Sequence, residues 1–283
     1  MAAFAASLEG SIEAPYVTET HESIPSTNER ARRLAAQGHS DVAVIADEQT
    51  HGRGRRDRGW TGPPGGIYAS ILLCPDRSPG DAPLFTLAAA VAAVSACEAV
   101  GVDAGIKWPN DVIVEVDAGG DGKKDNEITG RGGRKLAGIL TETETEDDQL
   151  SWLVVGIGIN ANVDPETLPS GATSLSGERG TDIDRRVAIR ELLDRFYELA
   201  NDPDAVLPAW RERAITLGRR VRVETADGTV EGKAVDVTPP GALVVETSTG
   251  PRTIHAGECS HLRRVATETD SKAETIETDD QED

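Results

Sequence analysis

The sequence predicts an α+β fold, in which helices flank a central mixed sheet and a small β-barrel follows toward the C-terminus. Up to Gly218, short apolar runs typical of strands alternate with longer segments of helical periodicity. After Gly218, five short alternating runs are separated by Asp-Gly, Pro-Gly and Thr-Gly turns, and this spacing favours a small barrel. We therefore expect an N-terminal extension (residues 1–22), a main domain (23–217), a small β domain (218–265) and a disordered acidic tail (266–283).

Two kinds of signal predict the helices. Ser26 and Glu29 have the spacing of a capping box, and Gly38 is a typical residue to end the helix that follows. Elsewhere, apolar side chains recur at the spacing of a helical stripe. The expected helices are the segment from Ser26 through Gln37, then Pro83–Val100, Asp182–Leu199 and Ala205–Ala214.

Short apolar runs bounded by glycine, proline or charged residues predict the strands. They are Val42–Ala46, Ile67–Leu73, Gly105–Lys107, Val112–Val116, Lys135–Glu142 and Leu150–Asn160. The segment Asp117–Gly133 is rich in glycine and charge without apolar periodicity, and we expect a mobile surface loop there. The acidic segment Thr143–Gln149 is expected to join the last two strands as a turn.

The composition is strongly acidic, with 49 acidic against 29 basic residues and a formal net charge of -20. Only six of the basic residues are lysines. Such a surface is typical of proteins kept soluble in high salt, and the alternative is an ordinary acidic cytosolic enzyme. The charge argues against general binding to nucleic acids or anionic membranes, since both need a positive surface.

The cysteines and the longest apolar run indicate a cytoplasmic protein. Three cysteines cannot all pair within the chain, and none has the spacing of metal ligands, so we expect reduced thiols. The N-terminus lacks the pattern of a signal peptide. The apolar run near Leu84–Val100 contains Ser95 and Glu98, and we expect it to be too short to span a bilayer.

An arginine-rich stretch, Asp47–Trp60 (DEQTHGRGRRDRGW), contrasts with the acidic chain around it. It holds four arginines within six positions, and we expect its glycines Gly52, Gly54 and Gly59 to adopt positive φ and let the backbone approach a ligand. Guanidinium groups bind phosphate in a bidentate manner, so the stretch predicts a phosphate-binding loop. A solvated basic loop and a nucleic-acid-binding segment remain as alternatives.

A second glycine motif has a different interpretation. Gly156 to Ala161 matches the dinucleotide-binding pattern G-x-G-x-x-A, but that motif requires a helix to follow. Here Asn162-Val-Asp-Pro165 follows, so we reject a dinucleotide site.

Five motifs in order resemble those of biotin protein ligase. They are STN from Ser26, Q-x-x-GRGR-x-x-R-x-W from Gln49, KWPND from Lys107, KLAGIL from Lys135 and GIGIN from Gly156. The resemblance extends from about Ser26 to Arg264. It implies a catalytic sheet like that of class II synthetases and a C-terminal SH3-like domain. Residues 1–22 leave no room for a DNA-binding domain, so we expect the ligase-only form.

The resemblance implies a two-step reaction with ATP and biotin as substrates and Mg²⁺ as the accompanying ion. The biotin carboxylate attacks the α-phosphate to give biotinyl-5′-adenylate. A lysine of a biotin carboxyl carrier domain of an acyl-CoA carboxylase then takes the biotinyl group. A homodimer is a further possibility. The alternatives are a lipoate or other acyl-group ligase of the same superfamily, and a non-enzymatic nucleic-acid module that uses the arginine loop.

The resemblance also assigns site residues, position by position, while it identifies no metal ligands. The expected catalytic residues are Lys135, Arg53 and Arg55. Those expected to bind biotin are Ser26, Thr27, Asn28, Gln49, Arg53, Gly54, Arg55 and Lys135. Those expected to bind ATP or the adenylate are Arg55, Arg58, Trp60, Lys107, Asn110, Asp111 and Asn160.

Overall fold

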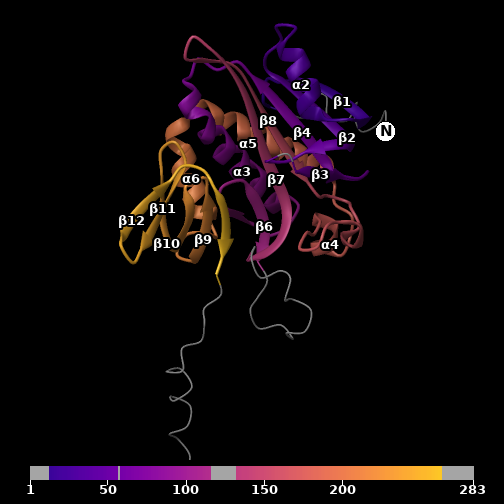
Figure 1. The fold of residues 1–283 in the computed structure, drawn as a ribbon. Coiled ribbons are helices and arrows are strands. Elements are labelled where there is room, and N and C mark those ends of the chain that lie inside the picture. Colours follow the sequence, from indigo (N-terminus) through magenta and orange to yellow (C-terminus); the bar gives the residue numbers. More distant parts are fainter. Residues whose placement is uncertain (1–12, 57, 116–131, 263–283) are drawn as a thin grey trace, which may run out of the picture.

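The computed structural model describes residues 13–56, 58–115 and 132–262. A large mixed sheet is flanked by helices, and a smaller antiparallel sheet lies beside it at the C-terminal end of the described chain (Figure 1). The predicted central mixed sheet is therefore confirmed. The predicted acidic tail and all but the last two residues of the predicted loop Asp117–Gly133 lie outside the described residues.

The large sheet has eight strands in the order β1-β2-β4-β8-β7-β6-β5, with β3 paired to β2. Only β1 and β2 run parallel among these pairs, and the remaining pairs are antiparallel. The strands are β1 (Val17–Ile24), β2 (Val42–Arg53), β3 (Gly59–Gly62), β4 (Ile67–Leu73), β5 (Gly105–Lys107), β6 (Asp111–Glu115), β7 (Gly133–Glu146) and β8 (Gln149–Ile159).

Helices cover both faces of this sheet. The main core lies on the face covered by α3 (Ala82–Ala99), α5 (Arg185–Asn201) and α6 (Pro203–Arg213). On the other face, α2 (Thr27–Ala35) packs through Ala31 and Leu34 onto a smaller apolar cluster. The short helix α4 (Leu175–Arg179) follows β8. All four helices predicted from the sequence are present, with ends within three residues of the predicted ones.

Helix α3 is the central helix of the main core. By length and composition, the segment Pro79–Ala99 could cross a membrane, contrary to our expectation from its length, but 67% of its apolar 18-residue window is buried inside the protein. It contacts α5, α6, β7 and β8, so its apolar surface is covered on several sides by other elements. Its many alanines allow this close approach, which burial of apolar surface stabilises.

Three predictions about the large sheet need correction. The strand β1 was not predicted, because its sequence VTETHESI has apolar residues only at its two ends. It pairs with β2, so the predicted boundary at residue 22 falls inside a strand of the large sheet. The acidic turn is also shorter than predicted, because β7 and β8 continue to Glu146 and Gln149 and leave only Asp147 and Asp148 between them, both at positive φ.

The C-terminal sheet contains the five predicted short strands. They are antiparallel in the order β12-β11-β10-β9-β13. Their bounds are β9 (Arg220–Thr225), β10 (Gly228–Thr238), β11 (Ala242–Thr247), β12 (Gly250–Ile254) and β13 (Glu258–His261). Strand β13 lies at one edge of this sheet and contributes to the site described next.

Candidate active site

A cavity of about 500 Å³ lies between strands of the large sheet, the turn after β5 and the β13 edge of the C-terminal sheet. This volume is within the usual range for small-molecule sites. Every residue that the motifs assigned to biotin or ATP lines this one cavity, although these residues come from widely separated parts of the sequence. They are Ser26, Thr27, Asn28, Gln49, Arg53, Gly54, Arg55, Arg58, Trp60, Lys107, Asn110, Asp111, Lys135 and Asn160.

A polar network begins where α2 starts. The Ser26 hydroxyl accepts from the backbone N–H of Glu29 at 3.4 Å, which confirms the predicted N-cap. The backbone N–H and the hydroxyl of Thr27 both lie within hydrogen-bond distance of Gln49 Oε1, at 2.8 and 3.0 Å. The hydroxyl of buried Ser70 lies 2.7 Å from Thr27 Oγ1 and 2.6 Å from Asn28 Oδ1. The cap and a buried serine therefore fix this end of the cavity.

The arginine-rich stretch forms a hairpin, because β2 continues to Arg53 and β3 begins at Gly59. Its glycines do not adopt positive φ as expected; Arg56 does, at 55°. Gly52 and Gly54 instead permit close approach across the hairpin. A Cβ added at Gly52 would lie 2.6 Å from the carbonyl oxygen of Trp60.

The hairpin arginines have partners on three different elements. Arg53 Nη1 donates to Glu142 Oε1 at 3.0 Å. Arg55 donates from Nη1 to Asn110 Oδ1 at 2.7 Å and from Nη2 to the carbonyl oxygen of Gly257 at 3.1 Å. Arg56 and Arg58 both bind the carboxylate of Glu258, at 3.2 and 3.0 Å. Burial lowers the pKa of the Arg55 guanidinium, which is the most enclosed cation of the hairpin.

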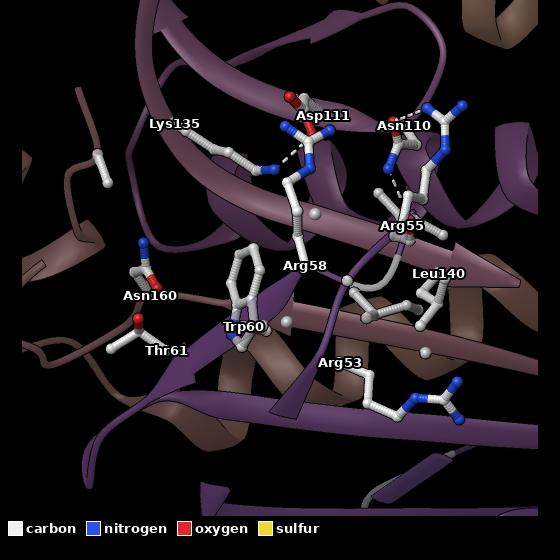
Figure 2. A pocket seen from close by; sticks show the side chains of 18 of the residues that line it. Arg53, Arg55, Arg58, Trp60, Thr61, Asn110, Asp111, Lys135, Leu140 and Asn160 are labelled. Carbon is white, nitrogen blue, oxygen red and sulfur yellow. Dashed lines mark hydrogen bonds and ion pairs between the residues drawn. The ribbon is translucent and has the colours of Figure 1, made fainter. Parts of the chain in front are cut away.

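Lys135 lies near the middle of the cavity (Figure 2). Its ammonium nitrogen is 2.6 Å from Asp111 Oδ1 and 5.3 Å from the centre of the Trp60 ring, a cation–π distance. Figure 2 shows the Arg53 guanidinium directed away from Lys135, whereas Arg55 lies beside Asn110. The structure thus brings Lys135, Asp111 and Trp60 together and leaves Arg53 at the opposite end.

Glycines of the KLAGIL and GIGIN motifs provide space for the side chains of the site. A Cβ at Gly138 would lie 2.9 Å from the Trp60 ring, and one at Gly158 would lie 2.7 Å from it. A Cβ at Gly156 would lie 2.0 Å from Asn28 Oδ1. The glycine pattern that imitates a dinucleotide motif therefore serves to seat Trp60 and Asn28.

The KWPND turn joins the two sheets. Trp108 is buried, its backbone N–H donates to Thr216 Oγ1 at 2.9 Å, and its Nε1 donates to the carbonyl oxygen of Gly241 at 3.0 Å. This agrees with the expectation that Trp108 shapes the turn. Asn110 Nδ2 donates to the carbonyl oxygen of Ile139 at 2.8 Å, which orients the amide toward Arg55.

Two buried polar atoms at the cavity have no hydrogen-bond partner among the described residues. They are Asn160 Oδ1 and Trp60 Nε1. The other end of the Asn160 amide donates to the carbonyl oxygen of Thr173 at 2.9 Å, so its orientation is fixed. Buried polar groups are normally paired, and unpaired ones beside a cavity are available to a ligand.

Among the residues that sequence reasoning missed are three whose side chains bind motif residues of the site. They are Ser70, Glu142 and Glu258, each bound to a residue that the motifs did identify. Glu142 and Glu258 are two of 49 acidic residues, and nothing in their local sequence distinguishes them. Ser70 is the polar residue within the apolar strand Ile67–Leu73, and this polarity was the one available signal.

The described residues contain no group of three or more histidine, cysteine, aspartate or glutamate side chains that could hold a metal ion. Asp111 and Glu258 are the carboxylates that line the cavity in the described part of the chain, and both bind cationic side chains. A metal held by the protein alone is therefore not indicated for these residues.

Two protein-family models match this chain, and both describe ligases. Residues 20–160 match the Biotin/lipoate A/B protein ligase family, and residues 216–262 match the Biotin protein ligase C terminal domain. The cavity is lined by residues from both matched regions.

Individual relatives indicate which kind of ligase the chain resembles. The chain is 35% identical over 252 residues to the Bifunctional ligase/repressor BirA of Bacillus subtilis, covering 84% of this chain and 72% of the relative. It is 34% identical over 254 residues to the Biotin--[acetyl-CoA-carboxylase] ligase of Mycobacterium tuberculosis, and the match covers 84% of this chain and 86% of that relative. A biotin protein ligase from Aquifex aeolicus, solved in complex with biotin and ATP, superposes with a TM-score of 0.67 at 28% identity, covering 87% and 98%. The chain belongs to the biotin protein ligase family.

Proposed function

We propose that this protein is a biotin–[acetyl-CoA-carboxylase] ligase. It activates biotin with ATP to biotinyl-5′-adenylate, with release of pyrophosphate, and transfers the biotinyl group to a lysine of a biotin carboxyl carrier domain, with release of AMP. The supporting observation is the single cavity that collects all the motif residues, together with relatives named Biotin--[acetyl-CoA-carboxylase] ligase at 34% and 30% identity.

The polar end of the cavity suits the ureido ring of biotin. Gln49 Oε1 accepts both Thr27 donors, so the Gln49 Nε2 hydrogens remain to donate to a ligand. Ser26 Oγ accepts from the cap and keeps its own proton to donate. A ureido carbonyl is a strong acceptor for these groups, whereas a dithiolane ring offers only weakly accepting sulfur atoms. Since donors left unpaired reduce binding, this end favours biotin over lipoate.

Cationic side chains at the cavity would assist the first step, in which biotin reacts with ATP. The biotin carboxylate must approach a polyanionic triphosphate, and preorganised cations lower the cost of that approach. In this scheme Lys135 contacts both the carboxylate and the α-phosphate, and Arg53 and Arg55 supply further positive charge. Arg58 and Lys107 contribute to nucleotide binding. The carboxylates that Lys135 and Arg58 bind in this structure, Asp111 and Glu258, would be exchanged for anionic groups of the substrates.

The adenylate would occupy the region around Trp60. The indole lies against Gly138 and Gly158 on the floor of the cavity, and it would stack with a purine. Asn160 Oδ1 is an unpaired acceptor that suits an exocyclic amine. Asn110 and Asp111 orient Arg55 and Lys135 toward the phosphates.

Mg²⁺ would enter with the nucleotide. This ion is usually held by substrate phosphates, waters and one or two carboxylates, and Asp111 and Glu258 at the cavity wall fit that role. When bound, it would neutralise phosphate charge during the attack of the carboxylate.

No enzyme nucleophile is required in this scheme. Cys259 lines the cavity, but burial raises the pKa of its thiol to about 11, so it is neutral at physiological pH. The second step is a direct attack of the carrier lysine on the acyl carbon. The predicted homodimer stays a separate prediction.

The direct test is transfer to a carrier. The protein is incubated with ATP, Mg²⁺, labelled biotin and a biotin carboxyl carrier domain, and parallel reactions contain lipoate or a carrier whose target lysine is replaced. We expect label only with biotin and the intact lysine. Transfer of lipoate with no transfer of biotin would contradict the proposal.

A further inference from the structure

Glu142 lies on β7 where two segments of the site meet. Its side chain is 18% exposed, and its two carboxylate oxygens have different partners. Oε2 accepts a hydrogen bond from Asn28 Nδ2 at 2.8 Å, and Oε1 accepts one from Arg53 Nη1 at 3.0 Å. One carboxylate therefore connects the start of α2 to the arginine hairpin.

Both ends of the Asn28 amide bind groups of the protein. Nδ2 donates to Glu142 and has a second, longer contact of 3.4 Å to the carbonyl oxygen of Leu140. Oδ1 lies 2.6 Å from the Ser70 hydroxyl, and the absent side chain of Gly156 leaves room for it. Both amide hydrogens therefore have protein acceptors, and these contacts fix the orientation of the Asn28 side chain.

Glu142 also balances positive charge. Its Oε1 lies 3.0 Å from Arg53 Nη1 and 3.7 Å from Arg32 Nη1. Without the carboxylate, two guanidinium groups would lie close together with no counter-charge between them, and Arg53 would lose its fixed direction. Hydrogen bonds between charged groups are stronger and more directional than neutral ones, so a neutral side chain would hold Arg53 less well.

We propose that Glu142 is a positioning residue for biotin binding, which acts through Asn28 and Arg53. The inference rests on the proposed function and identifies a residue behind the cavity wall. Asn28 adjoins Thr27, whose hydrogen bonds orient Gln49, so a disturbance at Glu142 reaches the end that receives the ureido ring. The groups assigned to the nucleotide have other partners, so biotin binding should suffer more than ATP binding.

Biotin-dependent exchange between ATP and pyrophosphate measures the effect, because it reports the first step alone. Glu142→Gln keeps the shape but turns a donor toward either Asn28 or Arg53. We expect KM for biotin to rise about tenfold, while KM for ATP and the melting temperature stay close to wild type. A KM for biotin within about twofold of wild type, or an equal rise of both KM values, would overturn the inference.

Glu144→Gln is the matched control. Glu144 lies on the same face of β7, two residues further on, and binds Trp152 outside the cavity. This variant should leave both KM values unchanged. If it raised KM for biotin as much as Glu142→Gln does, the rise would reflect any loss of charge on β7. The specific role of Glu142 would then be refuted.

An exchange of donor and acceptor between Asn28 and Glu142 tests their hydrogen bond directly. Asn28→Asp places two carboxylates together and should weaken biotin binding more than Glu142→Gln does. The double variant N28D/E142Q restores a donor and an acceptor with exchanged positions, so it should bind biotin about tenfold better than Asn28→Asp alone. Additive losses would overturn the inference. Wild-type protein without any biotin-dependent exchange would instead refute the proposed function, and the inference with it.

Discussion

Lys135 is held in this structure by a carboxylate, Asp111, whose place the substrate anions are expected to take. An ion pair of this kind at 4 Å is worth about 4 kcal/mol at an effective dielectric constant of 20. Loss of a positioned donor to developing charge costs roughly 10²–10³ in rate. Lys135→Ala should therefore lower pyrophosphate exchange by about that factor without a large change in stability.

Two comparisons sharpen this prediction. Lys135→Arg should also be slow, because a planar guanidinium does not replace a compact ammonium between two anions. Thermal melts of both variants serve as the control for folding. Pyrophosphate exchange by Lys135→Ala at nearly the wild-type rate would refute the catalytic role of Lys135. Arg53 or Arg55 would then be the better candidate for the main catalytic cation.

His261 supplies a prediction about pH. Burial, with the nearby cations Lys107 and Arg219, lowers the pKa of His261 to about 3, against about 6.5 for an unperturbed histidine. As the pH falls, His261 is therefore protonated in the unfolded chain at a higher pH than in the folded protein. The contribution of the neutral ring is fully present above about pH 6.5 and is lost as the pH falls toward 3, with a slope of at most about 1.4 kcal/mol per pH unit.

Denaturant unfolding of wild type and His261→Gln between pH 7 and pH 4 measures this slope. The variant should lose less free energy of unfolding on acidification than wild type does. His255→Gln, at an exposed histidine of the same sheet, should retain the wild-type slope. Equal pH dependence of His261→Gln and wild type would show that His261 is not the buried neutral group described here.

The arginine cluster could be predicted from composition, because four clustered arginines contrast with the acidic residues around them. Lys135 and the other motif residues were predicted through the resemblance to a known family, because a single lysine or serine is not distinctive by itself. Their supporting residues could not be predicted in the same way. Ser70 lies 43 positions from Thr27 and Glu142 lies 114 positions from Asn28, and no local pattern encodes contacts at such separations.

At the scale of elements, the arginine hairpin has few strong constraints. Its contacts to Glu258 join side chains that are 61% and 50% exposed on the arginine side, and such exposed pairs contribute little stability. Like charges along the hairpin also repel one another until an anion binds. We therefore expect the hairpin to be ordered further by ligand.

Hydrogen exchange tests this expectation. Amides of Thr50–Arg56 should exchange more slowly with biotin and ATP than without them, and those of the buried strand β4 should serve as an unchanged reference. Equal exchange of the hairpin amides in both conditions would contradict a ligand-ordered hairpin.

Elements with a clear helical period or a continuous apolar run were predicted well, and those without either were not. Ile67–Leu73 is buried along its whole length and was found with the predicted bounds. Strand β1 was missed because its outer position in the sheet requires few apolar residues. The hairpin was expected to be a loop because glycines weaken strand propensity, but here they permit the close approach of β2 to β3.

For the whole molecule, net charge dominates the expected response to salt. A charge of -20 destabilises the folded state through self-repulsion, and salt screens that repulsion. The melting temperature should therefore rise from low to molar KCl. A flat or falling melting temperature would show that the acidic surface does not limit stability.

The contact between the two sheets is the feature least accessible from sequence. Trp108 joins the KWPND turn to the C-terminal sheet, and Glu258 brings that sheet to the arginine hairpin. The motifs indicated two domains, but their spacing along the chain does not specify that β13 forms part of the cavity wall. The site therefore depends on both sheets.

The central claim is that this cavity activates biotin with ATP. Exchange of labelled pyrophosphate into ATP by the wild-type protein, with biotin, with lipoate or with neither acid, tests this claim most directly, because it requires neither a carrier nor the second step. We predict exchange that depends on biotin and is absent with lipoate. Exchange that is independent of biotin, or that occurs with lipoate alone, would contradict the account.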